Sequence, residues 1–182
     1  CSTPLALFKV VAASAAATGN IDNGQGTIQS QGVSALAATT LNNANGVLQS
    51  ASDLTLRLAQ DIDNRAGDIS AAGRLDLRGA AADTSAGSVD NAAGRISAGT
   101  GLWLAAQGVS NTEGGLIHSQ QQLRLDLGGA LDNRQGQVQS GDALRLDALR
   151  LLNEGGAIDS QRQLDLRIVD LLGNDRGALR SN

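Results

Sequence analysis

Apolar and polar residues alternate along the chain in short runs that return about every 20 residues. The clearest runs are Leu-x-Leu pairs, which place two apolar side chains on one face of an extended strand. These pairs begin at Leu54, Leu75, Leu102, Leu123, Leu144 and Leu164, and the first unit keeps only Leu36. The period of two predicts strands that each bury one face.

A second recurring feature is an asparagine followed three residues later by a glycine. The steps between successive asparagines are 20, 21, 27, 20, 22, 20 and 21 residues, and aliphatic residues flank each of them. These asparagines are Asn23, Asn43, Asn64, Asn91, Asn111, Asn133, Asn153 and Asn174. The glycines are Gly26, Gly46, Gly67, Gly94, Gly114, Gly136, Gly156 and Gly177. Paired-helix repeats need about 33 residues or more, so this period excludes them.

Each unit is therefore a short strand, an Asn-x-x-Gly turn, a second strand, and a third strand after a polar corner. Asn and Gly suit the turn because both tolerate a positive φ. One such coil cannot bury its aliphatic side alone, but coils stacked in register can. We predict an all-β fold, a right-handed parallel β-helix (solenoid) of about eight coils of roughly 20 residues, which makes a rod about 40 Å long.

The repeats divide the chain into two parts. Residues 20–182 are predicted to form the β-helix repeat domain, truncated at its C-terminal end. Residues 1–19 are an unassigned N-terminal segment or a degenerate coil. Neither end carries a pattern typical of a capping coil.

Composition and charge narrow the choice of partners. The net charge is −4, and the arginines are scattered among aspartates, which disfavours a nucleic-acid partner. Cys1 is the sole cysteine, so no intramolecular disulfide can form. No run of about eighteen apolar residues is present that would span a bilayer.

The best copies of the repeat are "IDNRAGDISAAGRLDL", "VDNAAGRISAGTGLWL" and "LDNRQGQVQSGDALRL". This phrase resembles the roughly twenty-residue repeats of filamentous haemagglutinin-type exoproteins of two-partner secretion systems, over about residues 20–182. The resemblance implies a rigid rod segment of a bacterial adhesin that is secreted or held at the outer surface and serves cell adhesion and virulence. It also implies three kinds of partner: an outer-membrane two-partner transporter, flanking coils of the same longer chain, and a receptor or glycan on a host or neighbouring cell.

Two other functions stay open. Similar repeats form the stalks of contact-dependent growth-inhibition toxins, and parallel β-helices also include polysaccharide-degrading enzymes. For an enzyme, the candidate pair is Asp63 and Asp90, which share a column in neighbouring coils. Strand spacing places such a pair about 5 Å apart, the separation found in retaining glycosidases. The 27-residue step leaves an extra loop at about residues 78–88, expected beside them.

The alternative interpretation is that Asp63 and Asp90 cap their turns through backbone hydrogen bonds. An enzyme would gather several carboxylates, arginines and aromatics around enlarged loops, whereas the charged and polar residues of this chain are spread evenly over the repeats. We therefore expect a structural and adhesive rod, without catalytic activity.

Trp103 is the most distinctive candidate for binding. Leu102 and Leu104 face inward, so alternation turns Trp103 outward, with Asp76 and Arg124 at matching positions in the flanking coils. We predict that Trp103, Arg124 and Asp76 form a binding surface, where the indole stacks on a sugar or partner group with the Arg124 guanidinium over its face. The alternative is that the ring only covers the strand surface.

His118 stands in an outward column otherwise held by Gln, Ser, Asp and Arg, so we interpret it as a solvated residue. With one His and one Cys, neither a metal site nor a Ser-His-Asp or Cys-His nucleophile can be assembled. The sequence thus predicts no catalytic residue, no metal and no cofactor.

Overall fold

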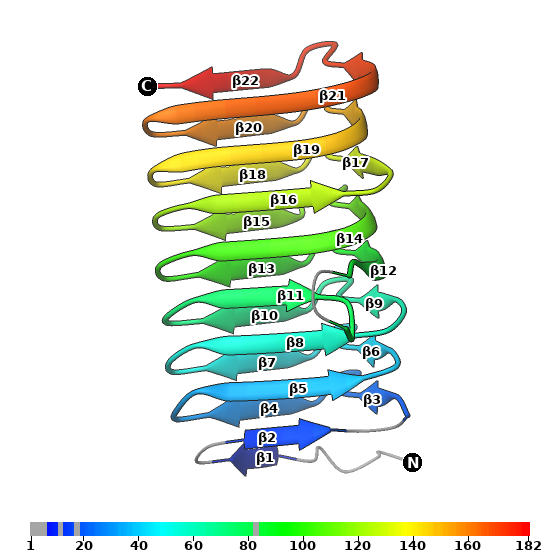
Figure 1. The fold of residues 1–182 in the computed structure, drawn as a ribbon, viewed down its shortest axis with the longest axis vertical. Coiled ribbons are helices and arrows are strands. Elements are labelled where there is room, and N and C mark those ends of the chain that lie inside the picture. Colours follow the sequence, from blue (N-terminus) through cyan, green and yellow to red (C-terminus); the bar gives the residue numbers. More distant parts are fainter. Residues whose placement is uncertain (1–6, 11–12, 17–18, 82–83) are drawn as a thin grey trace.

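The computed structural model describes residues 7–10, 13–16, 19–81 and 84–182, and these form a stack of parallel β coils (Figure 1). Every strand pair in these ranges is parallel, and the coils contain about 21 residues each over about eight turns. In Figure 1 the front strands run from left to right, and the chain climbs as it returns behind them. The winding is therefore right-handed, and the predicted fold class is confirmed.

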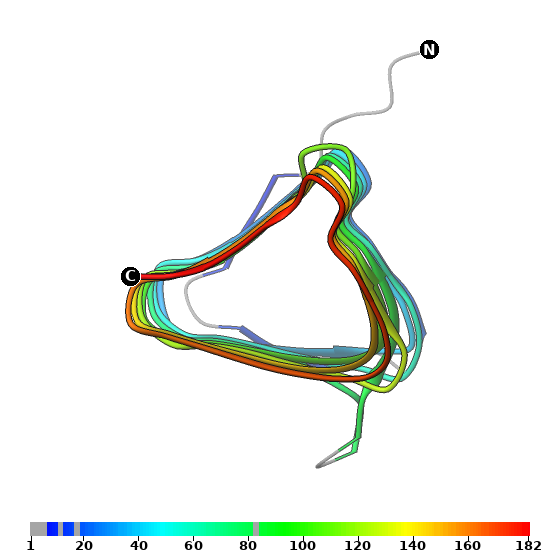
Figure 2. The same ribbon diagram turned by 90° about the horizontal axis from the view of Figure 1, so that it is seen from above.

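Seen along the axis, the coils superpose into a closed triangular outline (Figure 2). One side, which we call wall A, is a nine-stranded sheet in which each strand pairs with the equivalent strand of the next coil. Its strands are β1 (Leu7–Val10), β4 (Thr27–Ser30), β7 (Val47–Ser50), β10 (Asp68–Ala71), β13 (Arg95–Ala98), β15 (Leu116–Ser119), β18 (Gln137–Ser140), β20 (Ala157–Ser160) and β22 (Ala178–Ser181).

The other two sides belong to one thirteen-stranded sheet that bends around a corner. Wall B holds β2 (Ala13–Ala16), β5 (Ser34–Ala38), β8 (Leu54–Leu58), β11 (Leu75–Arg78), β16 (Leu123–Leu127) and the first parts of β14 (Leu102–Ser110), β19 (Ala143–Leu152) and β21 (Gln163–Gly173). Wall C holds β3 (Ile21–Asp22), β6 (Leu41–Asn42), β9 (Ile62–Asp63), β12 (Ala86–Asp90), β17 (Ala130–Asp132) and the second parts of the three long strands.

The core is a continuous column of aliphatic side chains inside the triangle. Leu75 and Leu77 of wall B, Ile96 of wall A and Leu131 of wall C are fully buried. The parallel register stacks like on like, so that Ile69 pairs with Leu48 below it and Ile96 above it. Period-two alternation therefore identified the inward positions correctly. Burial of each such side chain contributes roughly 1.5–3 kcal/mol before ordering entropy is subtracted.

The turn asparagines form a ladder of side-chain hydrogen bonds inside the corner between walls C and A. Asn23 Nδ2 donates to Asn43 Oδ1 at 2.6 Å, and the six later pairs up to Asn174 have the same bond at 2.7 Å. Each amide also reaches main-chain carbonyls, as Asn64 Nδ2 does with Arg95 O at 3.0 Å. The asparagines from Asn43 to Asn153 are completely buried, so these bonds satisfy polar groups that water cannot reach.

The turn glycines are required for a different reason from the one expected. The positive φ falls one residue earlier, on non-glycine residues in six coils, for example Ala66 at 52° and Ala93 at 55°. A Cβ on Gly67 would overlap the carbonyl oxygen of Asn43 and stand 2.7 Å from Asn64 Oδ1. Close approach to the coil below, and not backbone freedom, therefore demands glycine here.

One unit needs a correction of its own. Gly114 was expected to be the turn glycine of the Asn111 unit, but it carries a positive φ of 79° and has no neighbour that would meet a Cβ. Gly115 is the residue packed against Asn91 O and Asn111 Oδ1. The turn of this coil thus contains one extra residue, which explains its longer spacing.

The coil stack extends into the segment 1–19. β1 pairs with β4 and β2 pairs with β5, both in parallel register. The remainder of that segment, residues 1–6, 11–12 and 17–18, lies outside the described residues.

The extra residues of the 27-residue step form a loop between β11 and β12 that projects from the triangle (Figure 2). Gly79 N donates to Thr84 O at 2.8 Å, and Thr84 Oγ1 donates to Ala81 O at 2.8 Å, while residues 82–83 are not described. The loop precedes β12, whereas Asp90 ends this strand. It therefore does not lie beside the Asp63–Asp90 pair as expected.

Candidate functional site

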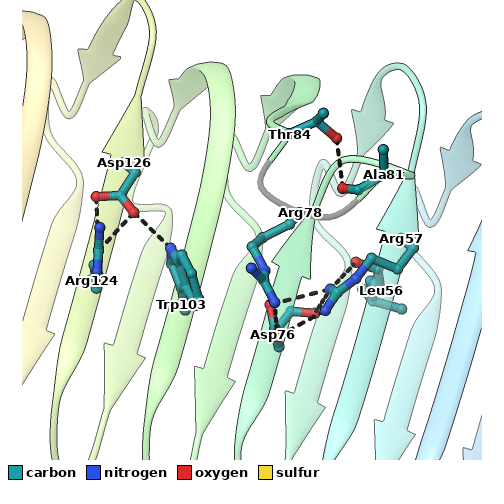
Figure 3. Close-up of polar contacts among 9 residues, drawn as sticks. All are labelled: Leu56, Arg57, Asp76, Arg78, Ala81, Thr84, Trp103, Arg124 and Asp126. Atoms are coloured by element: carbon teal, nitrogen blue, oxygen red, sulfur yellow. Dashed lines mark hydrogen bonds and ion pairs between the residues drawn. The ribbon is translucent and has the colours of Figure 1, made fainter.

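Wall B carries the candidate binding residues on its outer surface. The register pairs Trp103 of β14 with Asp76 of β11 on one side and with Arg124 of β16 on the other. All three side chains point outward, because Leu102 and Leu104 on either side of Trp103 are buried. The alternation in the sequence thus brings together the three residues that it singled out (Figure 3).

The indole is held by residues of both neighbouring coils. Trp103 Nε1 donates to Asp126 Oδ2 at 2.7 Å, and the guanidinium carbons of Arg78 and Arg124 lie 3.9 and 4.9 Å from the ring centroid. In Figure 3 the ring stands between Arg78 and Arg124. Cation–π contacts of this kind are worth about 0.5–1 kcal/mol at exposed sites.

Arg78 and Asp126 were missed by the sequence analysis, although Arg78 is closer to the ring than Arg124. Each lies two residues beyond a residue that was singled out, in the next outward column of the same wall. In that column Trp103's own strand carries Ala105, the register partner of Asp126. Ala105 faces outward but is only 7% exposed. Its small side chain gives the indole room to lean toward Asp126.

The contacts of Asp76 are with the arginines of an ion-pair network and not with the indole. Arg57 Nη2 lies 3.0 Å from Asp76 Oδ2, and Arg78 Nε lies 2.7 Å from Asp76 Oδ1. Burial favours the neutral acid, but the hydrogen bonds from Arg78 and Arg57 outweigh it, so the pKa of Asp76 lies below its usual 3.8. The network links β8 with β11 across the outer surface of wall B.

The pair considered for glycoside cleavage, Asp63 and Asp90, lies on wall C in register. Arg65 Nη2 approaches Asp63 Oδ2 at 2.6 Å, and its Nε lies 3.7 Å from Asp90 Oδ2. The hydrogen bond from Arg65 holds the pKa of Asp63 below its usual value. A general acid in a glycosidase needs a raised pKa, so this environment favours the opposite protonation state.

Asp63 and Asp90 also cap their turns. Asp63 Oδ1 accepts from Arg65 N, and Asp90 Oδ1 accepts from Ala92 N, each at 3.1 Å. An open depression of about 480 Å³ surrounds the pair. It is lined by Asp61, Ile62, Asp63, Arg65, Ser88, Val89, Asp90, Gly108, Val109 and Ser110. The capping bonds supply a structural reason for these aspartates, which is the second of the two interpretations.

His118 lies in an outward column of wall A between Ser97 and Gln139. Burial, with a smaller effect from Arg95, lowers the pKa of the imidazole below 6.5. Within the described ranges, no three His, Cys, Asp or Glu side chains are grouped so as to hold a metal ion. The described residues also contain no helical segment with the length and apolarity that a membrane crossing requires.

Comparisons with known proteins identified no relative of this chain. A scan against protein-family models found no match, and neither the curated proteins nor the solved structures contain one. The function is therefore inferred from the sequence pattern and from the geometry of the walls.

Proposed function

We propose that the chain is a rod segment of a secreted or surface-exposed bacterial adhesin of the filamentous haemagglutinin type. The observation that carries the proposal is the unbroken register of the coils along wall A. On wall A, nine strands from β1 to β22 pair in succession. Each residue pairs with the residue at the equivalent position of the repeat in the next coil. A fold built by repeating one interface is suited to spanning distance.

The rod is stiffened by features that recur in every coil. The three walls of parallel strands enclose one aliphatic core, and the asparagine ladder links the turns from Asn23 to Asn174. Eight rungs at strand spacing give a length of about 40 Å. Departures from this regularity are the loop between β11 and β12, the extra residue in the turn after Asn111, and a register shift between β19 and β21 at Ala148 and Arg150.

The outer surface supports a rod that works in water and among other cells. Oppositely charged side chains pair within strands, such as Arg124 with Asp126 and Arg145 with Asp147, each at 2.7 Å. Such exposed pairs add little stability, but they keep the walls hydrated and free of large fields of one sign. The repeated phrase and its likeness to exoprotein repeats support the same proposal.

On this proposal the chain leaves the cell through an outer-membrane two-partner transporter and touches a receptor or glycan on a host or neighbouring cell. A stalk of a growth-inhibition toxin would have the same walls, but it would extend a distant domain without adhering. The distinction is therefore adhesion by the rod itself.

Adhesion can be measured with beads that carry the purified chain at known density. We expect saturable attachment to cultured epithelial or bacterial cells, competed by free chain. The control is a set of beads that carry an unrelated folded protein at the same density. Attachment equal to that of the control, across both cell types, would contradict an adhesive role and favour the stalk.

A further inference from the structure

A pit lies on the outer surface at the start of β14, beside Trp103. Its volume is about 310 Å³. It is lined by Arg74, Gly101, Leu102, Trp103, Gln122 and Arg124. The pit exists because Gly101 has no side chain. Hydrogen bonds from Leu75 N to Gly101 O and from Leu102 N to Gln122 O place Gly101 between Arg74 and Gln122 in one corner column.

Two arginines give the pit its charge. The Arg74 side chain is exposed and has no hydrogen-bond or ion-pair partner among the described residues. The contact between Arg74 and Asp53 Oδ1 is made by the main-chain N of Arg74. Arg124 contacts Asp126 through Nε, at 2.7 and 2.9 Å from the two carboxylate oxygens. Its two terminal amino groups stay available. A planar carboxylate is the anion that a guanidinium binds most specifically, through two parallel hydrogen bonds.

The remaining walls suit a sugar ring. The Gln122 amide and the main chain of Gly101 offer neutral donors and acceptors for hydroxyl groups. Trp103 supplies an apolar wall, although Arg78 and Arg124 lie over its ring and leave it unsuited to stacking. The volume lies at the lower end of the range for ligand pockets, which limits the occupant to about one ring.

We propose that this pit binds a hexuronate, a pyranose that carries a carboxylate, with Arg74 and Arg124 on the carboxylate and Gln122 on a hydroxyl. A sulfated sugar is the alternative anion, and it differs from the uronate in presenting a tetrahedral group to the guanidinium groups in place of a planar one. The inference deepens the proposed adhesive function and rests on it for the source of the glycan.

Trp103 provides the assay, because it is the only tryptophan in the chain. We expect a galacturonate trisaccharide to change Trp103 fluorescence in a saturable manner, and a neutral galactose trisaccharide to leave it unchanged. The change reports on the pit directly.

The decisive variant is Gly101→Gln, which fills the pit and keeps the tryptophan. The nearest atom to a Cβ on Gly101 is Gln122 O at 3.9 Å, so the coil accepts a side chain. Ala143→Gln is the matched control, because Ala143 pairs with Gln163 in the same column but lies away from Trp103. We expect Gly101→Gln to abolish binding, Ala143→Gln to preserve it, and Arg74→Gln to weaken it roughly tenfold or more.

The proposal is overturned if the trisaccharide gives no saturable change, if Gly101→Gln binds as the parent does, or if a sulfated galactose oligosaccharide binds more tightly than the uronate. Circular dichroism confirms that each variant is folded. If coated beads adhere to cells but uronate does not bind, the adhesive function stands and this site falls. If uronate binds but the beads do not adhere, the site stands and the adhesive function falls.

Discussion

At the scale of single residues, the buried asparagines illustrate what spacing reveals and what it leaves out. The regular steps predicted a column of asparagines at the turns, and the structure contains it. The bonds from one amide to the next could not be predicted, because spacing does not specify how an amide is oriented within a turn. Each amide bridges two coils, so its loss takes one partner from the amide nitrogen below and the partner of the amide oxygen above.

Replacement of Asn91 by alanine should therefore lower the free energy of unfolding by about 2–4 kcal/mol, since Asn64 Nδ2 and Asn111 Oδ1 both lose a buried partner. Asn45→Ala is the control, because Asn45 is exposed and Ala66 and Ala93 hold the same turn position in other coils. Urea unfolding followed by circular dichroism measures both. Equal losses in the two variants would show that the ladder does not stabilise the fold.

The turn glycines allow a second test at this scale. Gly67→Ala should cost about 3 kcal/mol or more, because the new Cβ meets main-chain oxygen that cannot move without its coil. Gly155→Ala changes a residue with a positive φ of 66° but with space around it, so it should cost about 1 kcal/mol. Thermal unfolding of the two variants compares these costs. A larger effect at Gly155 would mean that backbone freedom, and not close approach, selects glycine in these turns.

At the scale of strands, alternation predicted which side chains face outward but not which outward side chains touch. Trp103, Asp76 and Arg124 share a column, as their positions in the repeat indicated. The ring nevertheless leans sideways over Ala105 toward Asp126. The direction in which the ring leans depends on the size of the residue in the neighbouring outward column. The order of apolar and polar residues along the chain does not contain that information. The binding role of the three residues stays a prediction.

The ion-pair network on wall B makes strand pairing sensitive to acid. Because the folded pKa of Asp76 lies below its unfolded value of about 3.9, its contribution is present above about pH 4 and is lost as the pH falls through the folded pKa. Asp76→Asn should cost about 1 kcal/mol at pH 7, an amount limited by solvent access to the pair. The difference in stability between the variant and the parent should shrink as the pH falls below about 4.

Asp165→Asn is the control for this measurement. Asp165 lies in the same column of wall B, beside Arg145, but makes no ion pair in the described part of the chain. Its replacement should change stability by less than about 0.5 kcal/mol at either pH. A gap between Asp76→Asn and the parent that persists undiminished at pH 3 would contradict an electrostatic origin.

At the scale of the whole molecule, each coil contacts only its two neighbours, so a complete coil should be removable. Deletion of residues 134–153 takes out the 20 residues between equivalent turn positions and joins Asn133 to Glu154. We expect a folded, shorter chain that is less stable but still unfolds cooperatively. Deletion of residues 134–143 removes half a coil and should give an unfolded or aggregated chain. Circular dichroism and size-exclusion chromatography separate these outcomes.

The central claim is that the coils lie in one register along a straight axis, and spin-label distances test it most directly. In a chain with Cys1→Ser, labels at residues 29 and 180 are seven coils apart in one column, and labels at residues 49 and 159 are five coils apart. At strand spacing these separations are about 34 and 24 Å, and the label linkers affect both alike. We predict two narrow distributions that differ by about 10 Å. Distances that are broad, or that do not increase with the number of intervening coils, would contradict the stacked rod.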